Sequence, residues 1–164
     1  MVALYVHIPF CRSRCAYCAF NTYAGLEALI PAYGEALCAE IRTVAQDLSC
    51  DVAQDLSCAT ATTVYFGGGT PSLLPPEVLA RILDGLRERF PLLPDAEVTL
   101  EANPGTVDRA YLRTARELGV NRLSLGVQSV HEDELRLLGR IHSWEDAVGA
   151  VELSLIHISE PTRL

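Results

Sequence analysis

His7-Ile8-Pro9-Phe10-Cys11-Arg12-Ser13-Arg14-Cys15-Ala16-Tyr17-Cys18 is the stretch that decides the fold. It places three cysteines at the spacing Cys-x-x-x-Cys-x-x-Cys, directly after a short apolar run. Cysteine thiolates are the usual ligands of a [4Fe–4S] cluster, and three of them leave one of its four irons without a protein ligand. An open iron can bind a small molecule. The alternative is a zinc site with His7 as the fourth ligand, although zinc sites usually use paired cysteines.

The composition is that of a globular protein. Of the 164 residues, 49% are hydrophobic and 21% are charged, which predicts one compact domain. The net charge is -8, and no arginine cluster interrupts the acidic chain, which argues against a nucleic-acid surface. We see no apolar run long enough to span a membrane and no basic segment of a secretory signal, and we expect a cytoplasmic protein.

Strand and helix signals alternate along the chain. Apolar, β-rich runs predict strands at 3–8, 63–66, 97–101 and 122–126. Helical spacing and capping residues predict helices at 29–48, 75–90 and 106–119, and others starting at 129 and 143. This order indicates four βα units and a parallel sheet. Functional groups of such folds gather at the carboxyl ends of the strands, where the cysteine loop, the triple glycine, Glu101 and Gln128 are found.

Two stretches are unusual. Residues 44–51 recur as 52–59 with one difference, which we interpret as a duplication in a surface connection, with Cys50 and Cys58 as copies without a ligand role. Residues 153–164 resemble the translation of a transposase adapter used in sequencing-library preparation. We therefore expect the domain to occupy 1–152, a non-native tail at 153–164, and the natural protein to continue beyond Glu152. A fifth strand at 155–158 is the alternative.

The segment 7–20, HIPFCRSRCAYCAF, resembles the signature of the radical S-adenosylmethionine (SAM) superfamily, and specifically its coproporphyrinogen-oxidase-like branch. The resemblance implies a partial (β/α)6 barrel, truncated here after about four units. It also implies a cluster on Cys11, Cys15 and Cys18, whose open iron takes the amino and carboxylate groups of SAM. One-electron reduction then cleaves SAM to methionine and a 5′-deoxyadenosyl radical, while the protein supplies position and excludes water.

Further residues match SAM-contacting positions of this family. Gly67-Gly68-Gly69-Thr70 is similar to its glycine motif for the methionine end of SAM, because glycines let backbone groups approach a ligand. The other matches are Glu101 for the ribose, Gln128, Arg140 for the carboxylate, and the aromatic residues Tyr5 and Tyr17. Ordinary alternatives are an exposed Glu101, a helix-end Arg140 and a barrel-core Tyr5.

Two members of the branch differ in activity. The oxygen-independent oxidase decarboxylates propionates to vinyl groups, and the heme chaperone binds heme and delivers it. The oxidase carries a fourth cysteine where this chain has Phe20, and a long extension before its first strand, so the resemblance favours the chaperone. It implies heme or porphyrin, a heme-accepting protein and an electron donor such as flavodoxin or ferredoxin as partners of the full-length protein. A zinc-stabilised binding module is a remote alternative.

Overall fold

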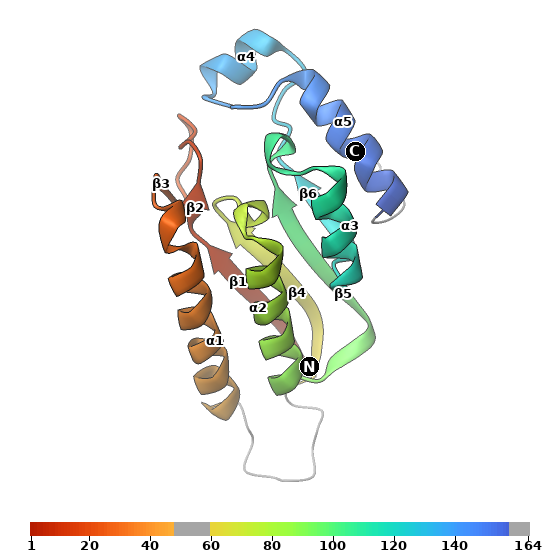
Figure 1. Cartoon of the computed structure of the whole chain (residues 1–164). Helices are drawn as coiled ribbons and strands as arrows, with labels where there is room; N and C mark the ends of the chain where they lie inside the picture. Colours follow the sequence, from red (N-terminus) through yellow and green to blue (C-terminus); the bar gives the residue numbers. More distant parts are fainter. Residues whose placement is uncertain (48–59, 158–164) are drawn as a thin grey trace.

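The structure is a computed structural model that describes residues 1–47 and 60–157 (Figure 1). Its strands are β1 (Val2–Ile8), β2 (Phe10–Cys11), β3 (Tyr23–Ala24), β4 (Ala61–Gly68), β5 (Leu92–Ala102) and β6 (Arg122–Leu125). Its helices are α1 (Ile30–Asp47), α2 (Pro76–Arg89), α3 (Arg109–Glu117), α4 (Glu132–Leu137) and α5 (Trp144–His157). Short 3-10 turns lie at Glu27–Leu29, Pro71–Leu73 and Pro104–Thr106.

The main sheet has the strand order β1-β4-β5-β6, and every pairing in it is parallel. Helices α1, α2 and α3 lie side by side over one face of the sheet, and α5 lies beside α3 (Figure 1). Consecutive strands joined by helices on one face are what a (β/α) barrel requires. The predicted α/β class with a parallel sheet of about four βα units is therefore confirmed.

Alternation along the strands separates two faces of the sheet. Val6, Ile8, Val64, Phe66 and Leu100 turn toward the helices and are buried. They form one core with apolar residues of α1 and α2. Burying each such side chain contributes about 1.5–3 kcal/mol relative to leaving it exposed. The core thus holds the strands in register and fixes where their carboxyl ends lie.

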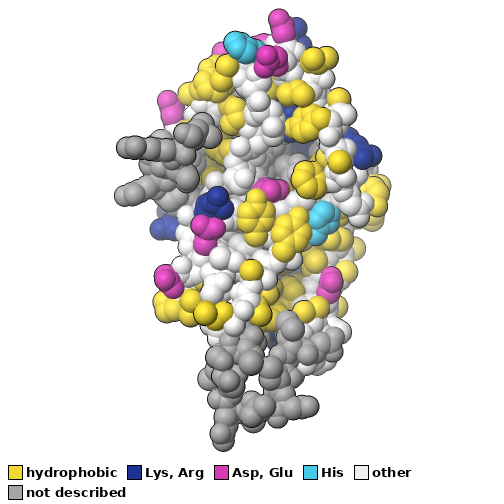
Figure 2. Space-filling view, turned by 180° about the vertical axis from the view of Figure 1, so that it is seen from behind, with side chains coloured by type: hydrophobic (Ala, Val, Ile, Leu, Met, Phe, Trp, Pro, Cys, Tyr) yellow, Lys and Arg dark blue, Asp and Glu magenta, His cyan; other side chains and the backbone are white. Residues whose placement is uncertain are grey.

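The other face of the sheet carries polar and aromatic side chains. Tyr5 and Tyr65 are register partners on β1 and β4, and their rings stack with centroids 6.0 Å apart. Figure 2 shows this side of the molecule, where aromatic, acidic and histidine side chains lie together above the sheet. Tyr5 is 59% exposed on this face, which is the face that a (β/α) barrel turns inward, so the alternative of a barrel-core aromatic stays open.

Predicted boundaries differ from the structure at the end of β4 and at the start of α3. Strand β4 continues through Gly67 to Gly68, because its pairing with β1 extends through His7↔Gly67 and Ile8↔Gly68. Helix α3 is capped by Asp108, whose Oδ1 accepts the Tyr111 N–H at 2.7 Å, and not by the predicted Thr106. Its predicted start was therefore wrong, since the 3-10 turn at Pro104–Thr106 precedes the helix.

Helices α4 and α5 test two predicted capping boxes. The capping box at Ser143 is confirmed. Ser143 Oγ accepts a hydrogen bond from the Asp146 N–H at 3.1 Å, and Asp146 Oδ2 accepts one from the Ser143 N–H at 2.9 Å. The box at Ser129 was wrong, because α4 starts later and its N-cap is His131. Ser129 Oγ instead accepts the His131 N–H at 3.0 Å and donates to Glu134.

Helix α5 reaches His157, the last residue that the structure describes. Residues 155–157 are helical, so the alternative strand at this position is wrong for those residues. The origin of residues 153–164 stays a prediction. Most of the duplicated stretch, with Cys50 and Cys58, lies outside the described residues. Among the described helices, none is both long and apolar enough to cross a bilayer.

Candidate cluster and cofactor site

The cysteine loop is closed at its base by a small second sheet. Strand β2 pairs with β3 in the register Phe10↔Tyr23 and Cys11↔Ala24, and the Tyr23 N–H donates to Pro9 O at 2.7 Å. Cys11 is 8% exposed, whereas Cys15 and Cys18 are half-buried, and all three thiols are free. They line one cavity of about 280 Å³ at the carboxyl end of the main sheet. The loop therefore presents three thiols to a single open cavity.

Two threonine hydroxyls accompany these thiols. Thr70 Oγ1 donates to Cys11 Sγ at 3.7 Å, and the buried Thr22 Oγ1 lies 3.8 Å from Cys18 Sγ. Burial raises the pKa of the Cys11 thiol, and hydrogen bonds from Thr70 and Thr22 partly offset this effect. Hydroxyls that hydrogen-bond sulfur suit thiolates, whose negative charge they stabilise. Sequence reasoning missed Thr22, since nothing in the spacing distinguishes it from a loop residue.

A cubane and a single zinc ion require different arrangements of the three thiols. Within 1–47 and 60–157, no three Cys, His, Asp or Glu side chains converge closely enough to hold one metal ion. A mononuclear zinc site needs such convergence. Thiolates of a cubane instead bind different irons of one larger cluster. The three thiols share one cavity, and the predicted cluster and the zinc alternative both stay predictions at this place.

The glycine segment packs directly against the cysteine loop. A Cβ on Gly69 would lie 2.6 Å from Phe10 O and 2.9 Å from Cys11 Sγ. Gly68 has φ +116°, and a Cβ there would lie 2.6 Å from the His7 ring. Only glycine fits at both positions, because other residues would displace backbone or adopt a strained conformation. This close packing explains why the sequence has glycines at this strand end.

The amide groups of this segment are already occupied. The Gly69 N–H donates to Ile8 O and the Thr70 N–H to Phe10 O, both at 2.8 Å. The Gly68 N–H donates to Glu101 Oε2 at 3.1 Å. These N–H groups hold the strands and the cysteine loop together, and the predicted approach of the segment's backbone to SAM stays a prediction.

Glu101 lies at the end of β5 and lines the cavity. Its Oε1 accepts the Tyr65 hydroxyl at 2.7 Å, and its Oε2 accepts the Gly68 N–H. A carboxylate has about four acceptor sites, so about two remain for hydroxyl groups of a ligand. Asn103 and Ser124 line the same wall, and strand alternation could have indicated Ser124, the register partner of Glu101.

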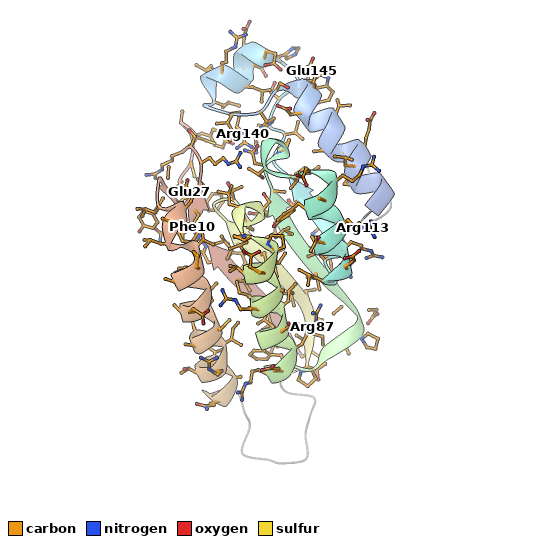
Figure 3. All side chains as sticks on the ribbon, viewed as in Figure 1. Phe10, Glu27, Arg87, Arg113, Arg140 and Glu145 are labelled. Atoms are coloured by element: carbon orange, nitrogen blue, oxygen red, sulfur yellow. The ribbon has the colours of Figure 1, made fainter. Side chains whose placement is uncertain are left out.

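Arg140 lines the cavity although it lies more than a hundred residues after the cysteine loop in the sequence. In Figure 3 its side chain extends from the segment between α4 and α5 toward the cysteine loop. Its Nη1 donates to Cys15 Sγ at 3.2 Å and its Nη2 to Gly126 O at 2.6 Å. The Ala16 N–H also donates to Leu138 O at 3.1 Å. Arg140 is thus no exposed helix-end residue: it contacts a predicted cluster ligand, and its Nε is buried without a partner among the described residues.

Most of the predicted site residues meet at this cavity. Those that line it are Cys11, Cys15, Tyr17, Cys18, Gly68, Gly69, Thr70, Glu101, Gln128 and Arg140. Burial raises the pKa of the Tyr17 hydroxyl, which lies near Arg140 and Cys15. Tyr5 and Gly67 do not line the cavity, because they lie further back on the sheet, where a Gly67 Cβ would meet the rings of Tyr65 and Tyr5.

One cavity at the strand ends of a parallel βα sheet is surrounded by a three-cysteine loop, a glycine segment and a carboxylate. This arrangement is typical of proteins that hold an iron–sulfur cluster beside a small cofactor. The model of the Radical SAM superfamily matches residues 5–157, and the chain belongs to this superfamily. Membership implies a [4Fe–4S] cluster and SAM as cofactors.

Similar proteins indicate to which branch of the superfamily the chain is related. The chain is 42% identical to heme chaperone HemW of Escherichia coli (strain K12), over 93% of this chain and 39% of the relative. It is 46% identical to HemW of Mycobacterium tuberculosis (strain ATCC 25618 / H37Rv), over 85% of this chain and 35% of the relative. Among solved structures, coproporphyrinogen III oxidase (HemN) of Escherichia coli, a radical SAM enzyme, matches with a TM-score of 0.82 and 31% identity, over 93% of this chain and 33% of that chain. The chain thus spans well under half the length of these relatives.

Proposed function

We propose that this chain binds a [4Fe–4S] cluster through Cys11, Cys15 and Cys18 and SAM in the adjoining cavity, as part of a heme chaperone of the HemW kind. The observation that carries the proposal is the convergence of ten predicted residues, from separate segments of the chain, on one cavity. The identity to HemW proteins supports the choice of branch.

The residues of the chain have distinct tasks in this proposal. When bound, the cluster and SAM supply one-electron chemistry that amino-acid side chains lack. The three thiolates ligate iron, and Glu101 accepts hydrogen bonds from the ribose hydroxyls. The guanidinium of Arg140 places positive charge beside Cys15 and the SAM carboxylate. Tyr17 and the loop cover the cavity and exclude water.

The oxidase is the second candidate, because the structure of HemN matches this fold closely. The residue Phe20 argues against the oxidase. The resemblance places a fourth cysteine of the oxidase at this position, and here an apolar ring, 66% exposed, lines the cavity. Heme, a heme-accepting protein, an electron donor such as flavodoxin or ferredoxin, and a cytoplasmic location are the further parts of this proposal.

The cluster is tested by the variant Cys15→Ser, with Cys38→Ser in α1 as the matched control. After anaerobic reconstitution we expect roughly four irons and four sulfides per parent chain, as in a cubane. Cys15→Ser should lose most of this content. Cys38→Ser should retain it, because Cys38 contacts Arg81 O on α2 and not the cavity. Zinc in the parent, or full iron loading of Cys15→Ser, refutes the cluster assignment.

The choice between heme chaperone and oxidase is tested on the full-length protein that contains this chain. Heme titration followed by absorbance should show stoichiometric binding, and incubation with coproporphyrinogen, SAM and a reductant should leave the propionates intact. Formation of vinyl product would identify an oxidase. SAM binding without either heme binding or decarboxylation would leave the superfamily assignment intact and refute the chaperone.

A further inference from the structure

His142 is a buried polar residue that the site as described does not use. It lies between Arg140 and the start of α5 and is 3% exposed. Its Nε2 lies 3.0 Å from Val127 O, and its Nδ1 is buried without a partner among the described residues. Burying an imidazole with only one nitrogen hydrogen-bonded costs folding free energy. Such a residue therefore calls for an explanation in the fold or in the site.

The hydrogen-bond partner fixes the state of the ring. A backbone carbonyl only accepts, so Nε2 carries the hydrogen, and in the neutral ring Nδ1 carries none. Burial lowers the pKa of His142, which favours this neutral form. The ring is thus a single directed donor to the carbonyl that precedes Gln128.

The residue after that carbonyl has an unusual backbone. Gln128 has φ 71°, the only positive φ outside glycine among the residues that the structure describes. Such a conformation costs on the order of 1 kcal/mol or more and persists only where neighbours hold it. The backbone itself closes this turn, because the Ser129 N–H donates to Val127 O at 3.0 Å. Two side chains add to it: Arg140 donates to Gly126 O at 2.6 Å, and His142 donates to Val127 O at 3.0 Å. Two successive carbonyls are thereby held by residues two apart in sequence.

We propose that His142 is a positioning residue: together with the Ser129 N–H, its hydrogen bond to Val127 O keeps Gln128 at positive φ and so aims the Gln128 side chain at the cavity. The inference rests on the proposed function, in which Gln128 contacts SAM. Gln128 lines the cavity while His142 does not, so His142 acts only through the backbone of 126–128. Without the donor, residue 128 relaxes toward negative φ and its side chain leaves the cavity wall.

A pair of amide variants separates the hydrogen bond from mere filling of space. In His142→Gln the amide nitrogen reaches the place of Nε2, whereas in His142→Asn it reaches only the place of Nδ1. With the anaerobically reconstituted protein, we expect His142→Asn to weaken SAM binding about tenfold, as the loss of one buried hydrogen bond predicts. His142→Gln should bind within about twofold of the parent, and iron content should not change. His142→Leu provides a second donor-free variant if the asparagine variant fails to fold.

A double-mutant cycle with Gln128→Ala decides whether the effect passes through Gln128. In that background His142→Asn should weaken SAM binding no further. Additive losses, or equal losses in His142→Gln and His142→Asn, would overturn the inference. Hydrogen exchange at residues 126–129 gives a readout without cofactor: it should accelerate in His142→Asn and not in His142→Gln. A parent that binds no SAM refutes the proposed function, and the exchange comparison still decides the role of His142 in the fold.

Discussion

Replacing Gly69 with alanine tests how tightly the glycine segment holds the cysteine loop. The new Cβ would lie 2.6 Å from Phe10 O, 2.9 Å from Cys11 Sγ and 3.0 Å from Ile8 O. Two of these atoms are backbone, so no side-chain rotation relieves the contact. Reaching an ordinary distance of 3.4 Å from Phe10 O requires a shift of 0.8 Å (3.4 less 2.6). Phe10 belongs to β2, the strand that carries Cys11, the first predicted cluster ligand, and Ile8 ends β1.

The expected loss follows from that shift. Overpacking of this kind costs about 1–3 kcal/mol. The shift also weakens the bonds from Gly69 to Ile8 and from Thr70 to Phe10, each contributing roughly 0.5–1.5 kcal/mol. We expect Gly69→Ala to lower the free energy of unfolding by about 2–4 kcal/mol, measured by urea denaturation, and to reduce iron loading because Cys11 moves.

The control is the same substitution at Gly85, inside α2. There a Cβ would meet only Ile41 Cδ1, at 4.0 Å. Alanine is favoured over glycine by about 1 kcal/mol in a helix interior. Gly85→Ala should therefore raise the free energy of unfolding and leave iron content unchanged. Equal stability and iron loading in Gly69→Ala and Gly85→Ala would refute the claim that Gly69 packs against the loop.

Two further substitutions test the cavity and the frame beneath it. Glu101→Gln keeps the size of the side chain but exchanges charged for neutral hydrogen bonds, a difference of about 1 kcal/mol, so SAM affinity should fall roughly five- to tenfold in a titration while iron content is retained. Unchanged affinity would contradict a ribose contact. Asp108→Ala removes the N-cap of α3 and should cost about 1 kcal/mol of unfolding free energy, whereas Asp108→Asn should stay near the parent. A similar loss in both Asp108 variants would mean that charge, and not capping, matters.

The strands and the order of elements could be predicted because their signals are local. The apolar run before Pro9 and the β-rich run before Gly67 each fall on a strand, and their alternation identifies the buried face. Boundaries were less predictable where neighbouring residues compete for the same role. Thr106 and Asp108 can both cap a helix, and only the 3-10 turn before α3 selects the second.

The site was predictable as a set of residues but not as a set of contacts. The family resemblance alone indicated Arg140, and its bond to Cys15 depends on how the chain after α4 returns to the cysteine loop. The positive φ of Gln128 and the burial of His142 likewise arise only in the assembled fold. Tyr5 stands in mid-strand, behind the carboxyl end where the cavity lies, so its predicted place beside the cofactor stays a prediction.

The contact between Cys15 and Arg140 joins residues 125 positions apart, and it bears on when metal can be inserted during synthesis. Ribosomes add about 5–20 residues per second, so Arg140 follows Cys15 by about 6–25 s. During that interval the nascent thiols have neither their guanidinium neighbour nor the Leu138 carbonyl that anchors the loop. We expect iron delivery to be most effective after this segment has left the exit tunnel, when the polypeptide can fold back over its own beginning.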